Sequence, residues 1–211
     1  MGSGAWYVHM LKLGLTGGIA SGKSAVAAIL RELGFPVLDA DSLSHQLMEP
    51  GQPAHDKIIR EFGADFAEGS GRIDRARLAA VVFADPAKLA RLNAILHPRV
   101  EQAMLVQFDA WRRSGLRDAA FVEAALLVEA GLTKYLDGLV VVFCTPEQQL
   151  ERLLARGMSE PEARGRIAAQ LPLEKKLRHA SYSIDCSGAL DSTRAQVLTL
   201  AAKLRQQASS P

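Results

Sequence analysis

The sequence has no large excess of charge and very little cysteine. Its 211 residues carry 25 Lys and Arg against 23 Asp and Glu, a formal net charge of +2, so we expect neither a nucleic acid nor an anionic membrane as a partner. The two cysteines, Cys144 and Cys186, stand outside any C-x-x-C spacing, which argues against a disulfide framework or a structural zinc site. These features favour an intracellular, reduced protein, and we expect it in the cytoplasm.

Long apolar runs are also missing. The best candidate, residues 139–144, is far shorter than the roughly 18 apolar residues that a membrane-spanning helix needs. Residues 1–9 lack the basic and apolar regions of a signal peptide, and their Gly-Ser start resembles a tag or an extension. We therefore expect no membrane segment, and a functional chain that begins at Met10.

The apolar runs that are present are short and alternate with helical patterns. They lie at residues 11–15, 35–38, 119–122, 139–143 and 182–184. Nearly continuous apolar strands separated by helices are typical of a parallel sheet that is covered on both faces. We predict an α/β protein in three layers, with a parallel sheet of about five strands and helices on both faces.

Two helical stretches are longer than a crossover between strands requires. We predict a nucleotide-binding core from residues 10–41, 119–145 and 179–208, a helical subdomain at 42–118 for the acceptor, and a helical lid at 146–178. The alternative for 146–178 is a solvated helical pair of mixed charge. Within 42–118 we expect Pro98 to separate one helix ending at residue 96 from another that starts at the proline.

Residues 17–24 match the phosphate-binding pattern G-x-x-x-x-G-K-[ST] between the first strand and the first helix. Glycines let successive N–H groups face a polyphosphate, and the helix N-terminus adds partial positive charge. Lys23 is expected to reach the β and γ phosphates, and the Ser24 hydroxyl to ligate Mg²⁺. The predicted ATP-binding residues are Gly17, Gly18, Ile19, Ala20, Ser21, Gly22, Lys23, Ser24 and Ala25.

The acceptor of the phosphate has to be read from other residues. A regulatory GTPase needs an N-K-x-D segment, which is absent, and the only D-x-x-G match, 185–188, lies in the last strand region. A small-molecule kinase needs a group beside the acceptor hydroxyl, and Asp39 and Asp41 follow the second strand at the edge where α/β sheets bind ligands. The alternative is that one of them caps a helix beginning near Ser42.

Together these residues resemble one family, the dephospho-CoA kinases, which phosphorylate the ribose 3′-hydroxyl of dephospho-CoA in the last step of coenzyme A synthesis. The resemblance spans residues 11–205 and implies a P-loop kinase fold, ATP and dephospho-CoA as substrates, and Mg²⁺ with the ATP. The matching elements, in order, are Leu15 to Ser24, Asp39-Ala40-Asp41, Leu92 to Pro98, Leu126 to Glu129, and Arg166 to Gln170 followed by Lys175-Lys176 and Ile184-Asp185.

The resemblance also implies roles for single residues. Asp41 is the catalytic carboxylate that orients the 3′-hydroxyl, and Lys23 and Arg156 neutralise charge on the transferring phosphoryl group. The residues on the substrate side are Thr16, Asp39, Asp41, His97, Leu127 and Glu129. Two of these keep an alternative, because Glu129 could form a structural salt bridge and His97 could cap the helix opened by Pro98.

Three positions depart from the family pattern. Ala20 stands where the family usually has Gly, Ala125 where it has Pro, and Cys186 where it has Asn. We expect the methyl group of Ala20 to be tolerated if its φ is negative. Cys186 bears on the choice between ATP and GTP, because that region frames the adenine in the family.

Two other functions remain open from the residues alone. One is a kinase of the same fold that uses a nucleoside monophosphate or another small metabolite. The other is a nucleotide-binding module without catalysis. We expect a monomer or a small homo-oligomer in either case.

Overall fold

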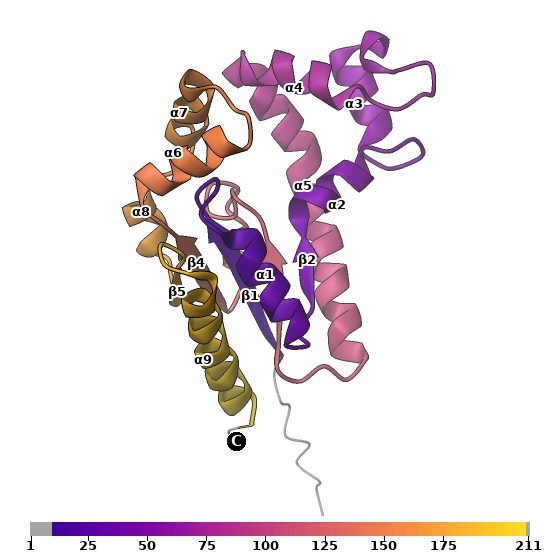
Figure 1. Ribbon diagram of the computed structural model, residues 1–211. Helices are drawn as coiled ribbons and strands as arrows, with labels where there is room; N and C mark the ends of the chain where they lie inside the picture. The colour runs from indigo at the N-terminus through magenta and orange to yellow at the C-terminus, as the bar shows by residue number, and fades with distance from the viewer. Residues whose placement is uncertain (1–9, 210–211) are drawn as a thin grey trace, which may run out of the picture. The chain divides into compact units, whose positions relative to one another are not determined.

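The computed structural model describes residues 10–209 (Figure 1), so the tag or extension predicted at 1–9 lies outside the described residues. The chain divides into two compact units. One contains the residues up to Leu38 and from Phe108 onward, and the other spans Asp39–Gln107.

The first unit is built on a five-stranded sheet of order β2-β3-β1-β4-β5. Its strands are β1 (Leu11–Gly17), β2 (Val37–Asp39), β3 (Ala119–Glu123), β4 (Gly138–Phe143) and β5 (Tyr182–Asp185). β1 runs parallel to both β3 and β4, and β4 runs parallel to β5. The prediction of an α/β protein with about five parallel strands is therefore confirmed.

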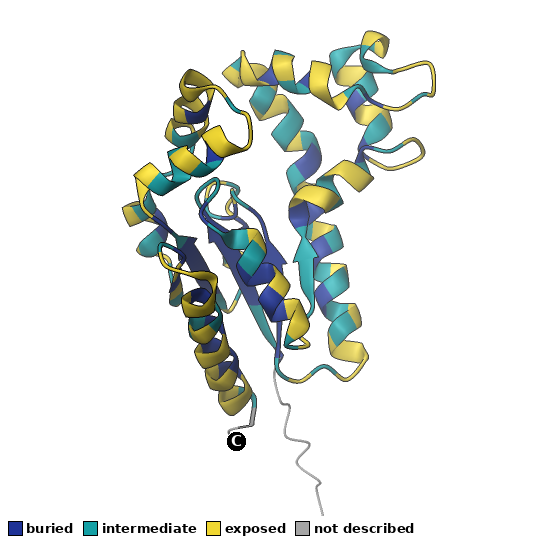
Figure 2. Ribbon diagram, in the orientation of Figure 1, coloured by how far each residue is buried: buried dark blue, intermediate teal, exposed yellow. Residues whose placement is uncertain are grey.

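Helices α1 (Lys23–Glu32) and α9 (Leu190–Ser209) pack side by side against one face of this sheet (Figure 1). Strands β1, β3 and β4 are dark blue over most of their length in Figure 2 because nearly all of their residues are buried. On the opposite face the absence of a side chain at Gly14 lets Leu127, Leu136 and Leu139 approach the strand, where a Cβ would meet their methyl groups at 2.7–3.1 Å. Continuous apolar strands fold this way because both faces of the sheet need a cover.

Three helices stand between β4 and β5: α6 (Pro146–Ala155), α7 (Glu160–Ala168) and α8 (Leu173–Leu177). α6 begins with a capping box in which Thr145 and Gln148 satisfy each other's backbone N–H groups. A short 3₁₀ helix, η2 (Leu132–Tyr135), lies between β3 and β4.

The second unit contains α2 (Ala40–Leu47), α3 (His55–Phe62), the 3₁₀ helix η1 (Ala64–Phe66), α4 (Arg75–Phe83) and most of α5 (Pro86–Arg113). It has its own apolar core, in which Ile58, Leu78 and Val82 are fully or almost fully buried. Among residues 10–209, no helix has the length and hydropathy to cross a bilayer. That each unit or segment has the separate role predicted from the sequence stays a prediction.

The expected helix break at Pro98 is wrong, because α5 runs through it without interruption. A proline inside a helix removes one i→i−4 hydrogen bond, here the one to the carbonyl of Ala94, and its ring crowds that carbonyl. The carbonyl of the next residue, Ile95, accepts a hydrogen bond from the Arg99 guanidinium. The helix therefore persists at a local cost.

We expect Pro98→Ala to raise the free energy of unfolding by about 1–3 kcal/mol, because alanine restores the backbone donor and the proline's effect on the unfolded chain offsets only part of this gain. Pro86→Ala is the matched control, since Pro86 is the first residue of the same helix and proline is favoured there. Urea unfolding followed by helical circular dichroism measures both. If Pro98→Ala lost as much stability as the control Pro86→Ala, the account would be contradicted.

His55 at the start of α3 links pH to the stability of the second unit. Its Nδ1 lies 2.9 Å from Asp56 Oδ1 and its Nε2 lies 2.8 Å from the carbonyl oxygen of Gly71. The Asp56 hydrogen bond, followed by the Gly71 carbonyl, raises the pKa of His55 above its ordinary value. Protonation of the imidazole therefore stabilises the folded state.

This stabilisation is fully present below the unfolded-state pKa of about 6.5 and is lost as the pH rises through the higher folded-state pKa. We expect the wild type to exceed His55→Asn in unfolding free energy by more at about pH 5.5 than at about pH 8.5. Urea unfolding at the two pH values tests this. An equal difference in unfolding free energy between wild type and variant at both pH values would show that the charge on His55 contributes nothing to stability.

Candidate active site

The loop between β1 and α1 is closely surrounded by neighbouring groups, and this crowding explains its first two glycines. A Cβ at Gly17 would come within 2.4 Å of the Val142 carbonyl oxygen, and one at Gly18 within 2.2 Å of Gln149 Nε2. A side chain at Gly17 would force the loop away from the backbone of β4, and one at Gly18 would displace the Gln149 amide from the loop. The two glycines therefore allow the loop to lie against both neighbours.

Ala20 has a positive φ of 57°, so the negative φ on which tolerance of its methyl group was made conditional is not found. It is the only described non-glycine residue in the left-handed region, where an alanine is disfavoured by roughly 1–2 kcal/mol relative to right-handed backbone. The Ser21 N–H donates to the Gly18 carbonyl at 3.1 Å, which closes a turn with Ile19 and Ala20 at its centre. Glycine is favoured at the third residue of a turn with this φ.

Lys23 is the first residue of α1, and its Nζ lies 3.6 Å from Glu123 Oε1 at the end of β3. The second oxygen of Glu123 lies 3.5 Å from an Arg31 nitrogen, yet within the described chain it is buried without a hydrogen bond. Glu123 therefore lies between two cations, Lys23 and Arg31. Ser24 follows Lys23 and is exposed, so its hydroxyl is accessible beside the loop.

The sequence reasoning missed Glu123. It lies inside an apolar run, where a single carboxylate gives no motif, and only the pairing of β3 with β1 brings it beside Lys23. The available signal was a lone charge at the C-terminal end of a predicted buried strand, which is where parallel sheets place functional groups.

Three side chains from the 146–178 segment hold the loop by its backbone. Gln149 Nε2 donates to the Ile19 carbonyl at 2.8 Å, and Gln170 Oε1 accepts the Ile19 N–H at 2.7 Å. Arg152 donates to the Ala20 carbonyl at 3.1 Å and to the Cys186 carbonyl at 2.8 Å. The arginine predicted for the phosphoryl group, Arg156, is exposed at the C-terminal end of α6, so its role stays a prediction, while Arg152 is the arginine at the loop.

A second network lies beneath the loop, around the Ala125 carbonyl. This carbonyl accepts from Thr16 Oγ1 at 3.2 Å and from Lys176 Nζ at 2.7 Å. Lys176 is almost fully buried and also pairs with Glu129 at 3.0 Å, and Glu129 accepts the Leu171 N–H. The salt bridge that was the alternative for Glu129 is therefore present.

Thr16 and Leu127 offer no exposed surface in this structure, since both have 0% relative exposure. Their side chains pack inside the first unit, so neither reaches a ligand without rearrangement. Their predicted contacts with the acceptor have no support in this packing and stay predictions.

Cys186 and Cys144 lie at the ends of β5 and β4, next to the loop. The Cys186 side chain lies against Gly22, where a Cβ would meet its Sγ at 2.9 Å, and Cys144 Sγ lies 3.8 Å from the Ala20 carbonyl oxygen. Burial raises the pKa of both thiols, so they remain protonated at neutral pH. Cys186 therefore acts as a packing residue beneath the loop.

The second unit carries the remaining predicted residues. Asp39 caps α2, with Oδ1 accepting the N–H groups of Asp41 and Ser42 at 2.9 and 3.0 Å, so the capping alternative is correct for Asp39. Asp41 is exposed in the first turn of the same helix. His97 lies in the middle of α5 and caps nothing, and burial lowers its pKa, which leaves the imidazole neutral at pH 7.

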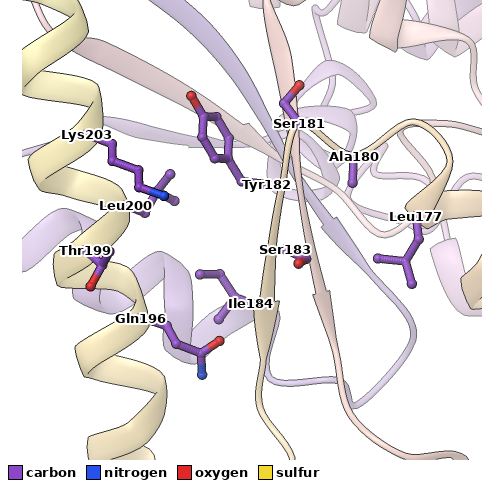
Figure 3. A pocket seen from close by; sticks show the side chains of 10 residues that line it. All are labelled: Leu177, Ala180, Ser181, Tyr182, Ser183, Ile184, Gln196, Thr199, Leu200 and Lys203. Carbon is purple, nitrogen blue, oxygen red and sulfur yellow. The ribbon is translucent and has the colours of Figure 1, made fainter.

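Two cavities of the first unit differ in their relation to the loop. One of about 380 Å³ is lined by Gly18, Ser21, Gln149, Gln170 and Lys176, among others. The other, of about 510 Å³, lies between β5 at the sheet edge and α9 and is lined by Tyr182, Ile184, Leu200 and Lys203 together with other side chains (Figure 3). Only the first adjoins the phosphate-binding loop.

We expect Ala20→Gly to raise the free energy of unfolding by about 0.5–1 kcal/mol, because glycine removes the steric cost of the positive φ and adds a smaller entropic cost. Ala28→Gly in the middle of α1 is the matched control and should lower it by about 1 kcal/mol. Thermal or urea unfolding distinguishes the gain in stability expected for Ala20→Gly from the loss expected for Ala28→Gly. Destabilisation of equal size in both variants would contradict the strain assigned to Ala20.

Comparisons with known proteins agree with the resemblance drawn from the sequence. The family model for dephospho-CoA kinase (CoaE) matches residues 11–192. A dephospho-CoA kinase of Geobacillus kaustophilus is 44% identical over 191 residues, covering 90% of this chain and 94% of that protein. One of Carboxydothermus hydrogenoformans is 45% identical over 192 residues, covering 90% and 93%.

The same agreement holds for a solved structure. The crystal structure of TT1252 from Thermus thermophilus is similar with a TM-score of 0.79 at 35% identity, over 92% of this chain and 97% of that one. With the parallel sheet, the glycine loop and Lys23 at the start of α1, these matches show that the chain has a P-loop kinase fold and belongs to the dephospho-CoA kinase family.

Proposed function

We propose that this kinase transfers the γ-phosphoryl group of ATP to the ribose 3′-hydroxyl of dephospho-CoA, giving coenzyme A and ADP in the last step of coenzyme A synthesis. The observation that carries the proposal is the position of Lys23, which stands at the N-terminus of α1 directly after the glycine-containing loop that follows β1. Membership of the dephospho-CoA kinase family selects the acceptor.

The nucleotide side of the reaction is assigned to the loop. Backbone N–H groups within residues 17–25 that donate no hydrogen bond in the described chain, such as that of Ala20, and the N-terminus of α1 attract the phosphates. The Lys23 ammonium neutralises charge that develops during transfer. In the structure this ammonium is held by Glu123 at 3.6 Å, so its position is fixed before a nucleotide binds. Fixed charges of this kind stabilise a transition state without reorganisation.

Magnesium fits the residues that adjoin Lys23. Mg²⁺ usually takes one or two protein oxygens together with phosphates and waters, and here the buried Glu123 Oε2 has no hydrogen bond within residues 10–209 while the Ser24 hydroxyl is exposed. No group of three or more His, Cys, Asp or Glu among these residues could hold a metal, in keeping with a metal that arrives with ATP. When bound, Mg²⁺ would supply positive charge against the negative charge of the phosphates, and the residues that would hold it are Ser24, through its hydroxyl, and Glu123, through a water.

The acceptor side is assigned to the second unit. Asp41 orients the 3′-hydroxyl and accepts its proton as the phosphoryl group is transferred. Asp39 fixes the first turn of α2 through its capping hydrogen bonds to Asp41 and Ser42, and so fixes the backbone that carries Asp41. A neutral His97 is suited to donate or accept a hydrogen bond to dephospho-CoA, together with the predicted contacts of Thr16, Leu127 and Glu129.

The remaining parts of the proposal concern the lid, the adenine base of ATP, and the location and oligomeric state of the enzyme. Arg156 reaches the phosphoryl group if the lid closes over the nucleotide and excludes water. Cys186 supports the backbone beside the adenine base of ATP. Unlike the asparagine that is usual in the family, it offers the adenine no side-chain amide. Two unpaired buried thiols are in keeping with a cytoplasmic enzyme, and we propose a monomer or a small homo-oligomer.

The test of the reaction is acceptor specificity. Purified protein with Mg·ATP is incubated with dephospho-CoA, AMP, UMP or no acceptor, and ADP formation is followed together with the mass of the product. We expect ADP and a phosphorylated product with dephospho-CoA alone. Transfer only to another acceptor, or no transfer at all, would contradict the proposed function.

The test of the roles is Asp41→Asn. We expect its kcat to fall by about 10²–10⁴-fold because the positioned carboxylate is lost, while the Kd for ATP stays within about twofold because the phosphate loop is untouched. Asp65→Asn, an exposed carboxylate of the same unit, is the matched control and should keep full activity. Lys23→Ala should lose ATP binding, and an active Asp41→Asn would overturn the role of Asp41.

A further inference from the structure

The central peptide group of the turn at residues 18–21 can adopt two orientations, and only one of them is compatible with the observed φ of Ala20. Rotation of the central peptide group, which consists of the Ile19 carbonyl and the Ala20 N–H, interconverts turns with positive and negative φ at the third residue. An alanine favours the negative value. The observed turn, with φ at 57°, is therefore the less favoured orientation for this sequence.

Side chains from outside the loop hold that orientation. Gln149 Nε2 donates to the Ile19 carbonyl, the oxygen that would have to turn away if the peptide group rotated. Gln170 fixes the N–H of the same residue, and Arg152 fixes the Ala20 carbonyl on the other side of the turn. Gly18 makes the first contact possible, since a Cβ there would collide with the Gln149 amide.

The orientation matters because it decides what the loop presents to a ligand. In a trans peptide the N–H points away from the carbonyl, so the Gln149 hydrogen bond to the Ile19 carbonyl turns the Ala20 N–H away from Gln149. Within residues 10–209 this N–H donates no hydrogen bond, unlike the N–H groups of Ile19 and Ser21 on either side. It is a backbone donor available to a phosphate oxygen.

We infer that Gln149, with support from Gln170, is a positioning residue that keeps the strained Ile19–Ala20 peptide in the orientation that binds the nucleotide phosphates. The inference rests on the proposed ATP site and adds the side chains that maintain it. Affinity for a ligand falls in proportion to the fraction of protein in the competent conformation. Loss of Gln149 lowers that fraction because it removes the hydrogen bond to the Ile19 carbonyl, the contact that most directly opposes the steric preference of Ala20.

The test is a cycle of four proteins: the wild type, Gln149→Met, Ala20→Gly and the double variant. Methionine has a similar length but no donor, and glycine accepts either orientation with little cost. We expect Gln149→Met to raise the Kd for Mg·ATP, measured by calorimetry, about tenfold when residue 20 is alanine. With glycine at position 20 the same substitution should raise it by no more than about threefold.

Kinetics and a control separate this role from a general loss of structure. Gln149→Met should raise the KM for ATP by a similar factor while kcat at saturating ATP stays within about twofold. Gln207→Leu is the matched control, because it removes a glutamine whose hydrogen bond, 3.1 Å to the Tyr182 hydroxyl, lies on α9 away from the loop. Gln207→Leu should leave the Kd for Mg·ATP unchanged. If Gln149→Met fails to fold, Gln170→Leu repeats the test by removing the hydrogen bond to the Ile19 N–H.

Two outcomes overturn the inference and are distinguishable. A wild type that binds no ATP overturns the proposed function, and this inference with it. A wild type that binds ATP, with a Gln149→Met effect that is absent or is equally large whether position 20 holds alanine or glycine, overturns only the inference, since the glutamine then acts independently of the strained turn.

Discussion

The close approach of the β1–α1 loop to the ends of β4, β5 and α6 is the constraint on which the active site depends. The loop backbone lies against the Val142 carbonyl at Gly17, the Gln149 amide at Gly18 and the Cys186 side chain at Gly22. None of these contacts leaves room for a Cβ. A nucleotide-binding loop must keep its N–H groups uncovered, and the fold achieves this by removing side chains from the loop and supplying its hydrogen bonds from neighbouring elements.

The charged side chains around the loop are likewise held in place by their neighbours. Lys23, Glu123 and Arg31 form one cluster in which a buried carboxylate lies between two cations, and Lys176 with Glu129 forms another beneath the loop. Buried ion pairs contribute little net stability when desolvation is counted, but they fix the position of each charge. For a reaction whose transition state needs positioned charge more than strong basicity, fixed position is the useful property.

The features that could be predicted from the sequence are those written in consecutive residues. The strands follow short, mostly apolar runs, of which the one at β5 is the weakest, and the loop from Gly17 to Ser24 is one pattern between a strand and a helix. Glu123, Gln149, Arg152 and Gln170 were missed because each is a single polar residue whose partner is distant in the chain, so only strand pairing and helix packing reveal it. Pro98 was misjudged because the rule that proline ends a helix is a local preference, and α5 continues through the proline despite the lost hydrogen bond.

The hydrogen bonds around the loop also limit how the 146–178 segment can move. α6 is tied to the loop through Gln149 and Arg152 and to the residues after β5 through Arg152 and Gln148. In contrast, α7 forms ion pairs between its own residues, as in Arg164 with Glu160 and Arg166 with Glu162. Moving α6 would break the contacts that hold the strained turn, whereas moving α7 would break only the one from Gln170. A closure that keeps the loop competent for ATP must therefore leave the part of α6 that carries Gln149 and Arg152 in place and take its motion from the residues that follow, Arg156 included.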